Sequence, residues 1–414
     1  MTLASTAAGQ PVRVRIFLPA DPGRMRIGGI ATFVRGFVKY APEDFDLSMV
    51  GVTASLPTWT WQRMELEGRR ISFLPVVHAG DQRGRMPIAA RYVAALARRG
   101  RGLGSGVVGS FHRPLTDLPI RQSGPMWRVV HLGVEDLATK GSESRWARIA
   151  GGLAMSERRS FRRMERIYVV NRQVTGDYRA RFPEVADRFA FLPNWVDPAI
   201  FGGVAAGARH EERGRVAAEL GLTPEAPLLL FAGRLEGQKD PLLMVRALAA
   251  LRERHPEAHL LIAGEGSLQA ATRTELQALG IGTAATFLGT VPREQVARLM
   301  HAADALLITS AFETGPTVGL EALASGLPVL TTDVGEVAAV VAESGAGRVA
   351  AERTPQALAA AADWVLTRPT PGLRDDAVRA ARPFMADRVL GAVYDANRDM
   401  AVRLAFAEPS RPIG

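Results

Sequence analysis

Short apolar runs alternate with amphipathic stretches along the chain. In the first half, such runs predict strands at Val12–Leu18, Leu47–Val52, Ile71–Val77, Gly106–Ser110, Arg128–Leu132 and Arg166–Val170. Apolar residues at helical spacing predict helices between several of these runs, for example over Pro87–Arg99 and Glu157–Met164. Such alternation is typical of a parallel sheet covered by helices.

The regular pattern lapses between Phe191 and Arg215, where we place a linker. A second α/β pattern follows, with strands predicted at Leu228–Ala232, His259–Ala263, Ala285–Leu288, Ala305–Thr309 and Pro328–Thr331. Helices are predicted over Pro241–Arg254, Arg293–His301, Pro316–Ala324 and, singly or as a pair, Asp375–Arg403. The chain is therefore expected to be α/β, with a Rossmann-like domain over residues 1–200 and another over 201–383.

Length and composition exclude several classes of protein. At 414 residues the chain is long enough for two hydrophobic cores. It has no cysteine, which excludes disulfide scaffolds, thiolate metal sites and cysteine nucleophiles. The N-terminus lacks the pattern of a signal peptide, and no apolar run reaches membrane-spanning length. We therefore expect a cytoplasmic protein.

The net charge of +9 points to anionic partners, which are phosphates, nucleic acid or an acidic membrane surface. A nucleic-acid module would interleave aromatic and basic residues on one surface, but the arginines here are scattered, so no nucleic acid is expected. Arg158-Arg159 and Arg162-Arg163, in a predicted helix, favour peripheral contact with anionic lipid at the inner face of the membrane. A solvated helix face explains these arginines equally well.

Ligands of open α/β sheets bind beyond the carboxyl ends of the strands, so the residues that follow strands are candidates for a site. Arg234 and Lys239 share the loop after a predicted strand, and Lys239 is one of only three lysines among 51 basic residues. Two cations before a helix N-terminus suit a diphosphate. A solvated basic loop is the simpler alternative.

A second cluster follows the predicted strand Ala305–Thr309. Glu313 lies on the loop and Glu321 lies in the next helix, so that one acid can meet a sugar and the other can bind vicinal ribose hydroxyls. The amides near Thr317 and Val318, at the helix start, are available to phosphate. An ordinary acidic helix start is the alternative. The glycines Gly264 and Gly266 are a weak signal, because glycines that end strands are common.

Six motifs occur in an order that resembles one known family. They are GGI at Gly28–Ile30, LPNWVD at Leu192–Asp197, FAGRLEGQKD at Phe231–Asp240, IAGEGS at Ile262–Ser267, FLGTV at Phe287–Val291 and ETGPTVGLEALASGLPV at Glu313–Val329. Over nearly the whole chain the sequence resembles the retaining, group 1 glycosyltransferases of GT-B fold, the family of bacterial mannosyl- and glucosyltransferases. The resemblance implies two Rossmann-like domains that face each other across a cleft. It also implies that C-terminal helices at about 384–405 complete the first domain.

The resemblance assigns roles to the motifs. Arg234 and Lys239 would hold the diphosphate of a UDP- or GDP-linked sugar, and Glu321 would hold the ribose. The donor-binding set is Gly28, Gly29, Arg234, Lys239, Gly266, Val291, Thr317, Val318 and Glu321, and the catalytic residues are His131 and Glu313. Two positions depart from the family pattern: Trp195 replaces a linker glycine, and Thr314 replaces the glycine after Glu313.

Two histidines follow predicted strands in the first half. A lone histidine at a strand end is more often structural, but His131 occupies the place of the family's active-site histidine, which implies a contact with the sugar. His112, beside Arg113, fits the acceptor side or simple packing equally well.

Neither a metal nor a cofactor is expected. The motif Asp44-Phe-Asp46 has the spelling of a metal-binding pair, but it precedes a strand, where aspartates commonly make turns. Cations and helix amides would stabilise the departing diphosphate instead. By resemblance, transfer retains stereochemistry and the leaving phosphate helps to deprotonate the acceptor.

We therefore expect an enzyme that moves a hexose from a nucleotide-diphosphate sugar to a glycan or lipid-linked acceptor, in the biosynthesis of cell-surface polysaccharide, lipopolysaccharide or glycolipid. Two alternatives stay open. A nucleotide-sugar epimerase or hydrolase of the same fold would act on the donor without an acceptor. A non-catalytic nucleotide-sugar-binding partner of another transferase would bind the donor without turnover.

Overall fold

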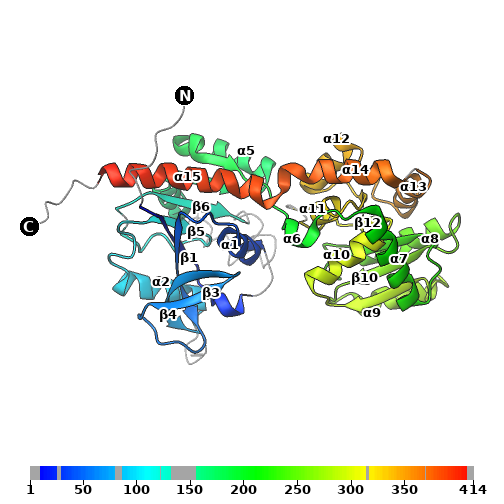
Figure 1. Ribbon diagram of the computed structural model, residues 1–414, viewed down its shortest axis with the longest axis horizontal. Coiled ribbons are helices and arrows are strands. Elements are labelled where there is room, and N and C mark those ends of the chain that lie inside the picture. The colour runs from blue at the N-terminus through cyan, green and yellow to red at the C-terminus, as the bar shows by residue number, and fades with distance from the viewer. Residues whose placement is uncertain are drawn as a thin grey trace, which may run out of the picture. The chain divides into compact units, whose positions relative to one another are not determined.

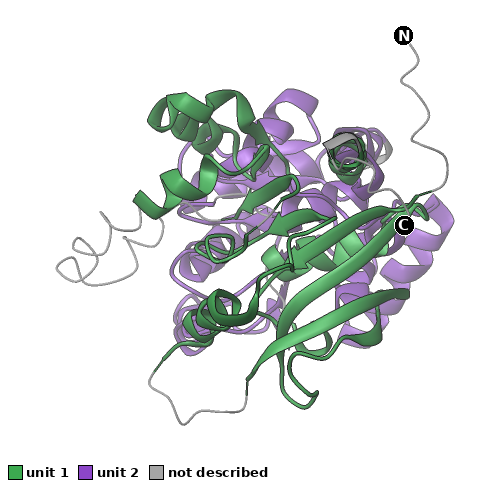
Figure 2. Cartoon of the chain, turned by 90° about the vertical axis from the view of Figure 1, so that its left-hand side faces the viewer, with its two compact units in different colours: residues 1–193, 390–414 green, residues 194–389 purple. Residues whose placement is uncertain are grey.

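The chain forms two compact units. A computed structural model describes residues 10–25, 29–79, 86–121, 123–131, 155–313, 317–368 and 370–407. One unit comprises residues 1–193 and 390–414, and the other comprises residues 194–389 (Figure 2). The sequence-based boundaries, after residues 200 and 383, lie several positions from these divisions.

The first unit is built on an eight-stranded sheet in the order β3-β4-β2-β1-β5-β6-β7-β8 (Figure 1). Its strands are β1 (Val12–Phe17), β2 (Phe45–Thr53), β3 (Gln62–Leu66), β4 (Arg69–His78), β5 (Val108–Phe111), β6 (Met126–Val130), β7 (Arg166–Val169) and β8 (Phe189–Phe191). Neighbours pair in parallel except β3 and β4, which are antiparallel. The apolar pattern does not predict β3, whose residues are half polar, or the three-residue β8.

Helices connect these strands. They are α1 (Gly29–Lys39), α2 (Ile88–Arg99), a helical segment at 155–161, α5 (Arg172–Arg181) and the short 3-10 helices η1 (Pro22–Arg24) and η2 (Pro183–Arg188). The last helix, α15 (Ala386–Ala407), also packs on this unit through its later residues. The Tyr394 hydroxyl donates to the Phe37 carbonyl at 2.9 Å, and the Trp127 indole donates to Asn397 Oδ1 at 2.9 Å. These buried hydrogen bonds fix α15 against α1 and β6.

The second unit contains a six-stranded parallel sheet in the order β11-β10-β9-β12-β13-β14. Its strands are β9 (Leu228–Ala232), β10 (His259–Ala263), β11 (Ala285–Gly289), β12 (Ala305–Ile308), β13 (Val329–Thr331) and β14 (Gly347–Val349). The predicted ends of β9 and β10 are correct. Strand β14 has only three residues and is not predicted by the apolar pattern.

Helices cover both faces of this sheet. They are α6 (Pro198–Phe201), α7 (Ala206–Leu220), α8 (Pro241–Arg252), α9 (Gln269–Ala278), α10 (Arg293–Ala302), α11 (Thr317–Ala324), α12 (Gly335–Ser344), α13 (Pro355–Leu366), α14 (Thr370–Ala381) and η3 (Arg382–Phe384). The predicted linker is wrong over residues 206–215, which lie in α7. This helix is mostly polar, and Glu212, Val216 and Ala217 are its buried residues.

Two apolar cores explain why the central strands of this sheet are continuous apolar runs. Leu228 and Leu230 belong to the core beneath α10 and α11, whereas Leu229 and Phe231 belong to the core beneath α8 and α13. Successive side chains of a strand point to opposite faces, so a sheet buried on both faces needs an apolar residue at every position. The carboxyl ends of these rigid strands then carry the polar loops. Among the described helices, none has both the length and the apolar character needed to cross a membrane.

Candidate functional site

Three loops at the carboxyl edge of the second sheet carry predicted site residues. Arg234 and Lys239 follow β9, Gly266 follows β10, and Glu313 follows β12. Strands β10, β9 and β12 are adjacent in the sheet, so their loops lie side by side. The parallel topology therefore brings together residues that are far apart in sequence.

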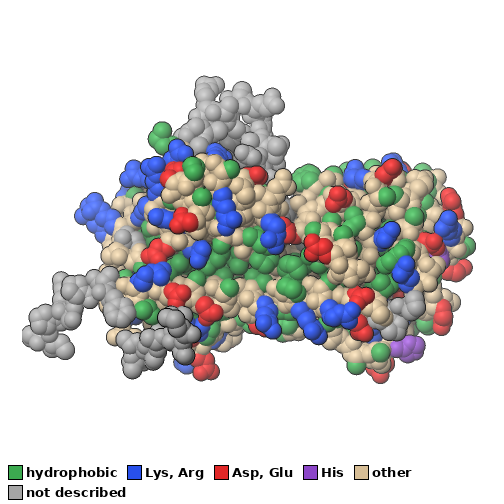
Figure 3. All heavy atoms as spheres, turned by 90° about the horizontal axis from the view of Figure 1, so that it is seen from above, with side chains coloured by type: hydrophobic (Ala, Val, Ile, Leu, Met, Phe, Trp, Pro, Cys, Tyr) green, Lys and Arg blue, Asp and Glu red, His purple; other side chains and the backbone are tan. Residues whose placement is uncertain are grey.

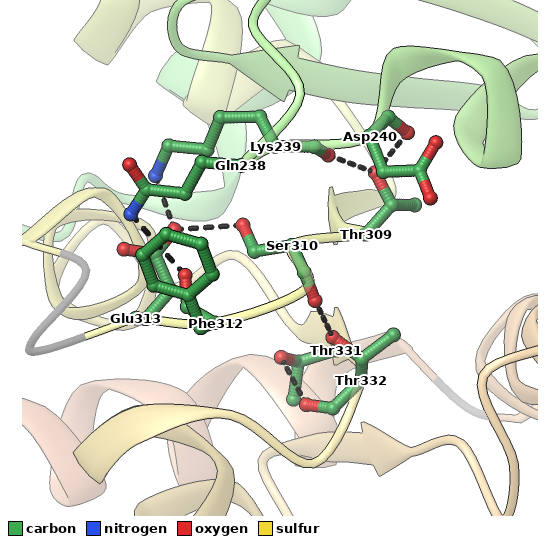
Figure 4. A network of polar contacts seen from close by, with 9 residues as sticks. All are labelled: Gln238, Lys239, Asp240, Thr309, Ser310, Phe312, Glu313, Thr331 and Thr332. Atoms are coloured by element: carbon green, nitrogen blue, oxygen red, sulfur yellow. Dashed lines mark hydrogen bonds and ion pairs between the residues drawn. The ribbon is translucent and has the colours of Figure 1, made fainter. Parts of the chain in front are cut away.

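Lys239 and Glu313 form an ion pair between Nζ and Oε1 (Figure 4). The pair is largely withdrawn from water, since the two side chains are 20% and 6% exposed. The Ser310 hydroxyl donates to the same carboxylate oxygen at 2.7 Å. Lys239 and Glu313 are predicted from the sequence, but Ser310 is not. Its position, three residues before Glu313 on the same loop, could have indicated it.

Further hydrogen bonds hold the β9 and β12 loops together. The Gln238 amide donates to the Phe312 carbonyl at 3.2 Å, and the Ala311 backbone N–H donates to the Gln238 carbonyl at 2.8 Å. The Thr309 hydroxyl donates to the Lys239 carbonyl at 2.7 Å. Figure 4 shows the contacts of Gln238 and Thr309 beside the ion pair. Backbone and side chains together therefore fix the positions of Lys239 and Glu313.

Close packing of backbone against backbone attaches the β10 loop to the β9 loop. At Gly264, φ is +143°, and an added Cβ would lie 1.9 Å from the Gly233 carbonyl oxygen. At Gly266, a Cβ would lie 2.3 Å from the Leu235 carbonyl oxygen. Both positions therefore require glycine for packing within the unit.

Glu236 joins the same two loops through its side chain. Its carboxylate accepts hydrogen bonds from the Ser267 hydroxyl at 2.7 Å and the Ser267 backbone N–H at 3.1 Å. These bonds, together with the nearby charge of Arg234, lower the pKa of Glu236 below its usual value. Arg234 itself is exposed and forms no hydrogen bond or ion pair with the described residues. Its guanidinium is therefore available to an anion.

Glu321 lies within α11 and is paired with a residue that the sequence analysis did not single out. Arg293, the first residue of α10, donates from Nη2 to Glu321 Oε1 at 3.0 Å. Burial raises the pKa of Glu321, the Arg293 charge partly offsets this effect, and Asp197 adds to it. Because 28 positions separate the pair, no local motif reveals it.

The remaining predicted donor residues are placed as follows. Thr317 and Val318 open α11, where helix amides lack intrahelical partners. Val291 is partly buried and its side chain packs against the apolar core, so its backbone is the part available to a base. Gly29 opens α1 of the first unit, and no heavy atom of the described residues lies within 4 Å of a Cβ built there. Gly28 and Thr314 lie outside the described residues.

His131 and His112 lie together at the carboxyl edge of the first sheet, after β6 and β5. Their ring centroids are 5.8 Å apart, and Phe33 of α1 contacts both rings at 5.8 and 5.4 Å. Ser110 Oγ lies 2.9 Å from His112 Nε2. Among the described residues, His131 Nε2 and His112 Nδ1 have no hydrogen-bond partner. The two histidines therefore form one aromatic cluster with Phe33.

Burial removes the charge from both imidazoles. It lowers the pKa of His131 to about 4, with a further contribution from Arg113. It also lowers the pKa of His112 well below the usual value, and the neighbouring His131 and Arg128 add to this effect. Both rings are therefore neutral near pH 7.

Two sequence features of the first unit, the Asp44-Phe-Asp46 motif and the paired arginines near Arg158, make local contacts. Asp44 accepts hydrogen bonds from Arg398 at 2.9 and 3.0 Å, which lower its pKa. Arg158 and Arg162 share Glu184 at 2.8 and 3.4 Å, and Arg163 donates to the Asp117 carbonyl. Figure 3 shows Lys and Arg side chains gathered toward the left of one face, with Asp and Glu side chains among them.

Part of the chain is similar to a known family. Residues 213–384 match the family described as glycosyl transferases group 1. The D-inositol 3-phosphate glycosyltransferase of Nocardia farcinica is 37% identical over 146 residues, which are 34% of this chain and 32% of that protein. The match thus spans about a third of that relative's length.

Solved structures share the fold over almost the whole chain. Sucrose-phosphate synthase from Thermosynechococcus elongatus has a TM-score of 0.70 at 17% identity, covering 96% of this chain and all of that one. HepE of Anabaena, solved with UDP and glucose, has a TM-score of 0.65 at 15% identity and covers 93% and 99%. WaaG, a glycosyltransferase involved in lipopolysaccharide biosynthesis, has a TM-score of 0.65 at 22% identity and covers 94% and 99%. The expected GT-B fold is confirmed.

Proposed function

We propose that this chain, whose residues 213–384 match the group 1 glycosyl transferases, is a member of that family that transfers a hexose from a nucleotide-diphosphate sugar to a hydroxyl acceptor. The observation that carries the proposal is the cluster of Lys239, Glu313 and Ser310 beside the exposed Arg234. It places two cations and a nearly buried acid on adjacent loops at the edge where α/β sheets bind ligands.

The two cations suit a leaving diphosphate. The Lys239 ammonium has three N–H donors, and Glu313 is its one charged partner among the described residues. Arg234 offers a planar fork that binds two phosphate oxygens. As the bond to the sugar breaks, negative charge grows on the diphosphate, and fixed cations stabilise that charge without rearranging. Transfer without a metal or cofactor is part of the proposal.

Glu313 is assigned to the transferred sugar. Lys239 and Ser310 both donate to Oε1, and among the described residues Oε2 accepts no hydrogen bond. Oε2 can therefore accept from a sugar hydroxyl while the rest of the carboxylate stays fixed. The Thr317 and Val318 amides at the start of α11 would complete the phosphate contacts, and the backbone near Val291 would face the base.

His131 is assigned to the sugar by family resemblance. Its neutral imidazole can donate or accept a hydrogen bond but does not act as a cationic acid near pH 7. We propose, with the family, that the sugar keeps its configuration, because the leaving phosphate takes the acceptor proton on the same face. The neutral histidine is compatible with this mechanism, which needs no further base.

The acceptor is proposed to be a glycan or a lipid-linked sugar of the cell surface, reached from the cytoplasmic face. Arg159 supports membrane contact, because it is exposed and has no hydrogen bond or ion pair with the described residues. Sedimentation with liposomes tests this contact. We expect binding to vesicles with anionic lipid and weaker binding by Arg159→Gln, and equal binding to neutral vesicles would contradict it.

Sugar transfer is tested with radiolabelled UDP-glucose, UDP-N-acetylglucosamine and GDP-mannose, each mixed with lipid-linked and oligosaccharide acceptors. We expect label in an acceptor product in the presence of EDTA, and its loss in Glu313→Gln. Conversion of the donor alone would instead indicate an epimerase or hydrolase. Binding of donor without any conversion would indicate a non-catalytic partner.

A further inference from the structure

Glu321 is held in surroundings that disfavour its charge. Its side chain is 14% exposed, and it lies in α11, which is apolar on the side that faces the core. Asp197, 3% exposed, is close enough to add repulsion. A carboxylate in this position needs a cation to stay ionised.

Arg293 supplies that cation in a fixed geometry. Its Nη2 lies 3.0 Å from Glu321 Oε1, and its guanidinium carbon lies 5.1 Å from the centre of the Phe201 ring. Phe201 is 1% exposed, so this aromatic face is a rigid support. The Arg293 side chain remains 35% exposed. The guanidinium is therefore anchored on one side and open to water on another.

Only one oxygen of Glu321 is used by this pair. Oε1 accepts from Arg293, whereas Oε2 accepts no hydrogen bond from the described residues. A carboxylate that binds two neighbouring hydroxyl groups needs free lone pairs and a fixed orientation. Arg293 provides the orientation and leaves Oε2 free.

We propose that Arg293 is a positioning residue that fixes Glu321 through Oε1 and presents Oε2 to the vicinal hydroxyls of a ribose. The proposal rests on the proposed function, since it assigns the sugar of the nucleotide to Glu321. It adds a residue, at the start of α10, on which recognition of the ribose depends.

The proposal predicts a dependence on pH. Burial and Asp197 already raise the pKa of Glu321, and Arg293 opposes them. Without Arg293 the pKa of Glu321 rises further, so a larger fraction of the acid is protonated at a given pH, and the protonated form accepts hydrogen bonds from hydroxyl groups poorly. Raising the pH ionises it again. A variant without the guanidinium should therefore lose affinity near pH 7 and regain it in alkaline solution.

The test compares Arg293→Met with Arg298→Met in the full-length protein by calorimetry at pH 6 to 9. Methionine keeps an apolar stem over Phe201 and removes the charge. Arg298 is a matched control because it also lies in α10 and pairs with a glutamate, Glu212, at 2.6 Å. The probes are UDP, GDP and ADP and their 2′-deoxy forms, and melting temperatures verify folding.

We expect Arg293→Met to bind the preferred diphosphate about tenfold more weakly at pH 7, as for the loss of one charge-assisted hydrogen bond, and to regain affinity as the pH rises to 9. It should also lose the preference for the ribose over the 2′-deoxyribose form, and Arg298→Met should keep both. An Arg293→Met variant that binds like the wild type at every pH and keeps this preference would overturn the proposal. A wild-type protein that binds none of the six nucleotides would instead overturn the proposed function and this inference together.

Discussion

The carboxyl edges of the two sheets differ in the charge of the side chains that they carry. In the second unit, Glu313 and Glu321 each meet a cation. In the first unit, His131 and His112 are buried beside Phe33 and are neutral near pH 7. The second unit thus pairs its acids with cations at this edge, whereas the first carries uncharged hydrogen-bonding groups. Substitutions in the two units should therefore produce different signatures.

The largest effect is expected from Glu313→Gln. The neutral amide removes the acceptor proposed for the sugar hydroxyl and leaves Lys239 without its partner, so kcat should fall about 100-fold or more. Steady-state kinetics measure the loss. Glu275→Gln is the matched control, because it breaks an ion pair between α9 and Arg246 of α8, outside the three loops. Equal kcat values for both variants would show that Glu313 does not take part in the reaction.

Lys239→Met tests the other member of the pair. It leaves the Glu313 carboxylate, 6% exposed, without a cation, and the free energy of unfolding should fall by about 2–4 kcal/mol. The double variant with Glu313→Gln should recover part of this loss, because no uncompensated charge remains. Additive losses in urea denaturation would show that the pair is not coupled.

Two glycine substitutions, one in each unit, compare how closely the backbone is packed at the two positions. Gly266→Ala should lower the free energy of unfolding by about 2 kcal/mol, because its Cβ would lie 2.3 Å from the Leu235 carbonyl oxygen. Gly29→Ala should leave the melting temperature unchanged, because the added carbon has no heavy atom within 4 Å in the part of the chain that the structure describes. If the donor phosphate approaches Gly29, the same variant should raise KM for the donor. A stable Gly266→Ala variant would contradict the packing described for the β10 loop.

The neutral histidine of the first unit makes stability depend on pH. The unfolded chain binds a proton at His131 below about pH 6.5, but the folded protein does so only below about pH 4. The unfolded state therefore binds more protons between these values, and stability falls on acidification by about 1.4 kcal/mol per pH unit. His131→Asn should show a shallower fall from pH 6.5 to 5 in urea denaturation. Parallel slopes would mean that the ring is charged in the folded state.

The smallest effect is expected from Ser267→Ala. Glu236 would lose its hydroxyl donor, so its pKa should rise and the β9 loop, which carries Arg234, should be joined less firmly to the β10 loop. The KM for the donor should rise roughly fivefold, as for one lost hydrogen bond. Thr274→Ala is the control, since that exposed hydroxyl donates only to the Ala270 carbonyl within α9. An unchanged KM would separate Glu236 from donor binding.

The central strands could be predicted from sequence because burial on both faces demands continuous apolar runs. Leu228–Ala232 and His259–Ala263 are correct at both ends for this reason. Elements with little buried surface carry little pattern, as in α7 and β3. The candidate site residues that directly follow strands could be predicted from the sequence, because the strands themselves could. Arg293 could not be predicted, because only tertiary packing brings it to Glu321.

Arg234 and Lys239 are proposed to bind a diphosphate, and calorimetric titration can measure this binding. Nucleoside diphosphates and monophosphates of the same base are titrated into the wild type and into Arg234→Met and Lys239→Met. We expect the wild type to bind one diphosphate about 100-fold more tightly than its monophosphate. Each substitution should remove most of this preference. A wild-type preference that survives both substitutions would contradict it.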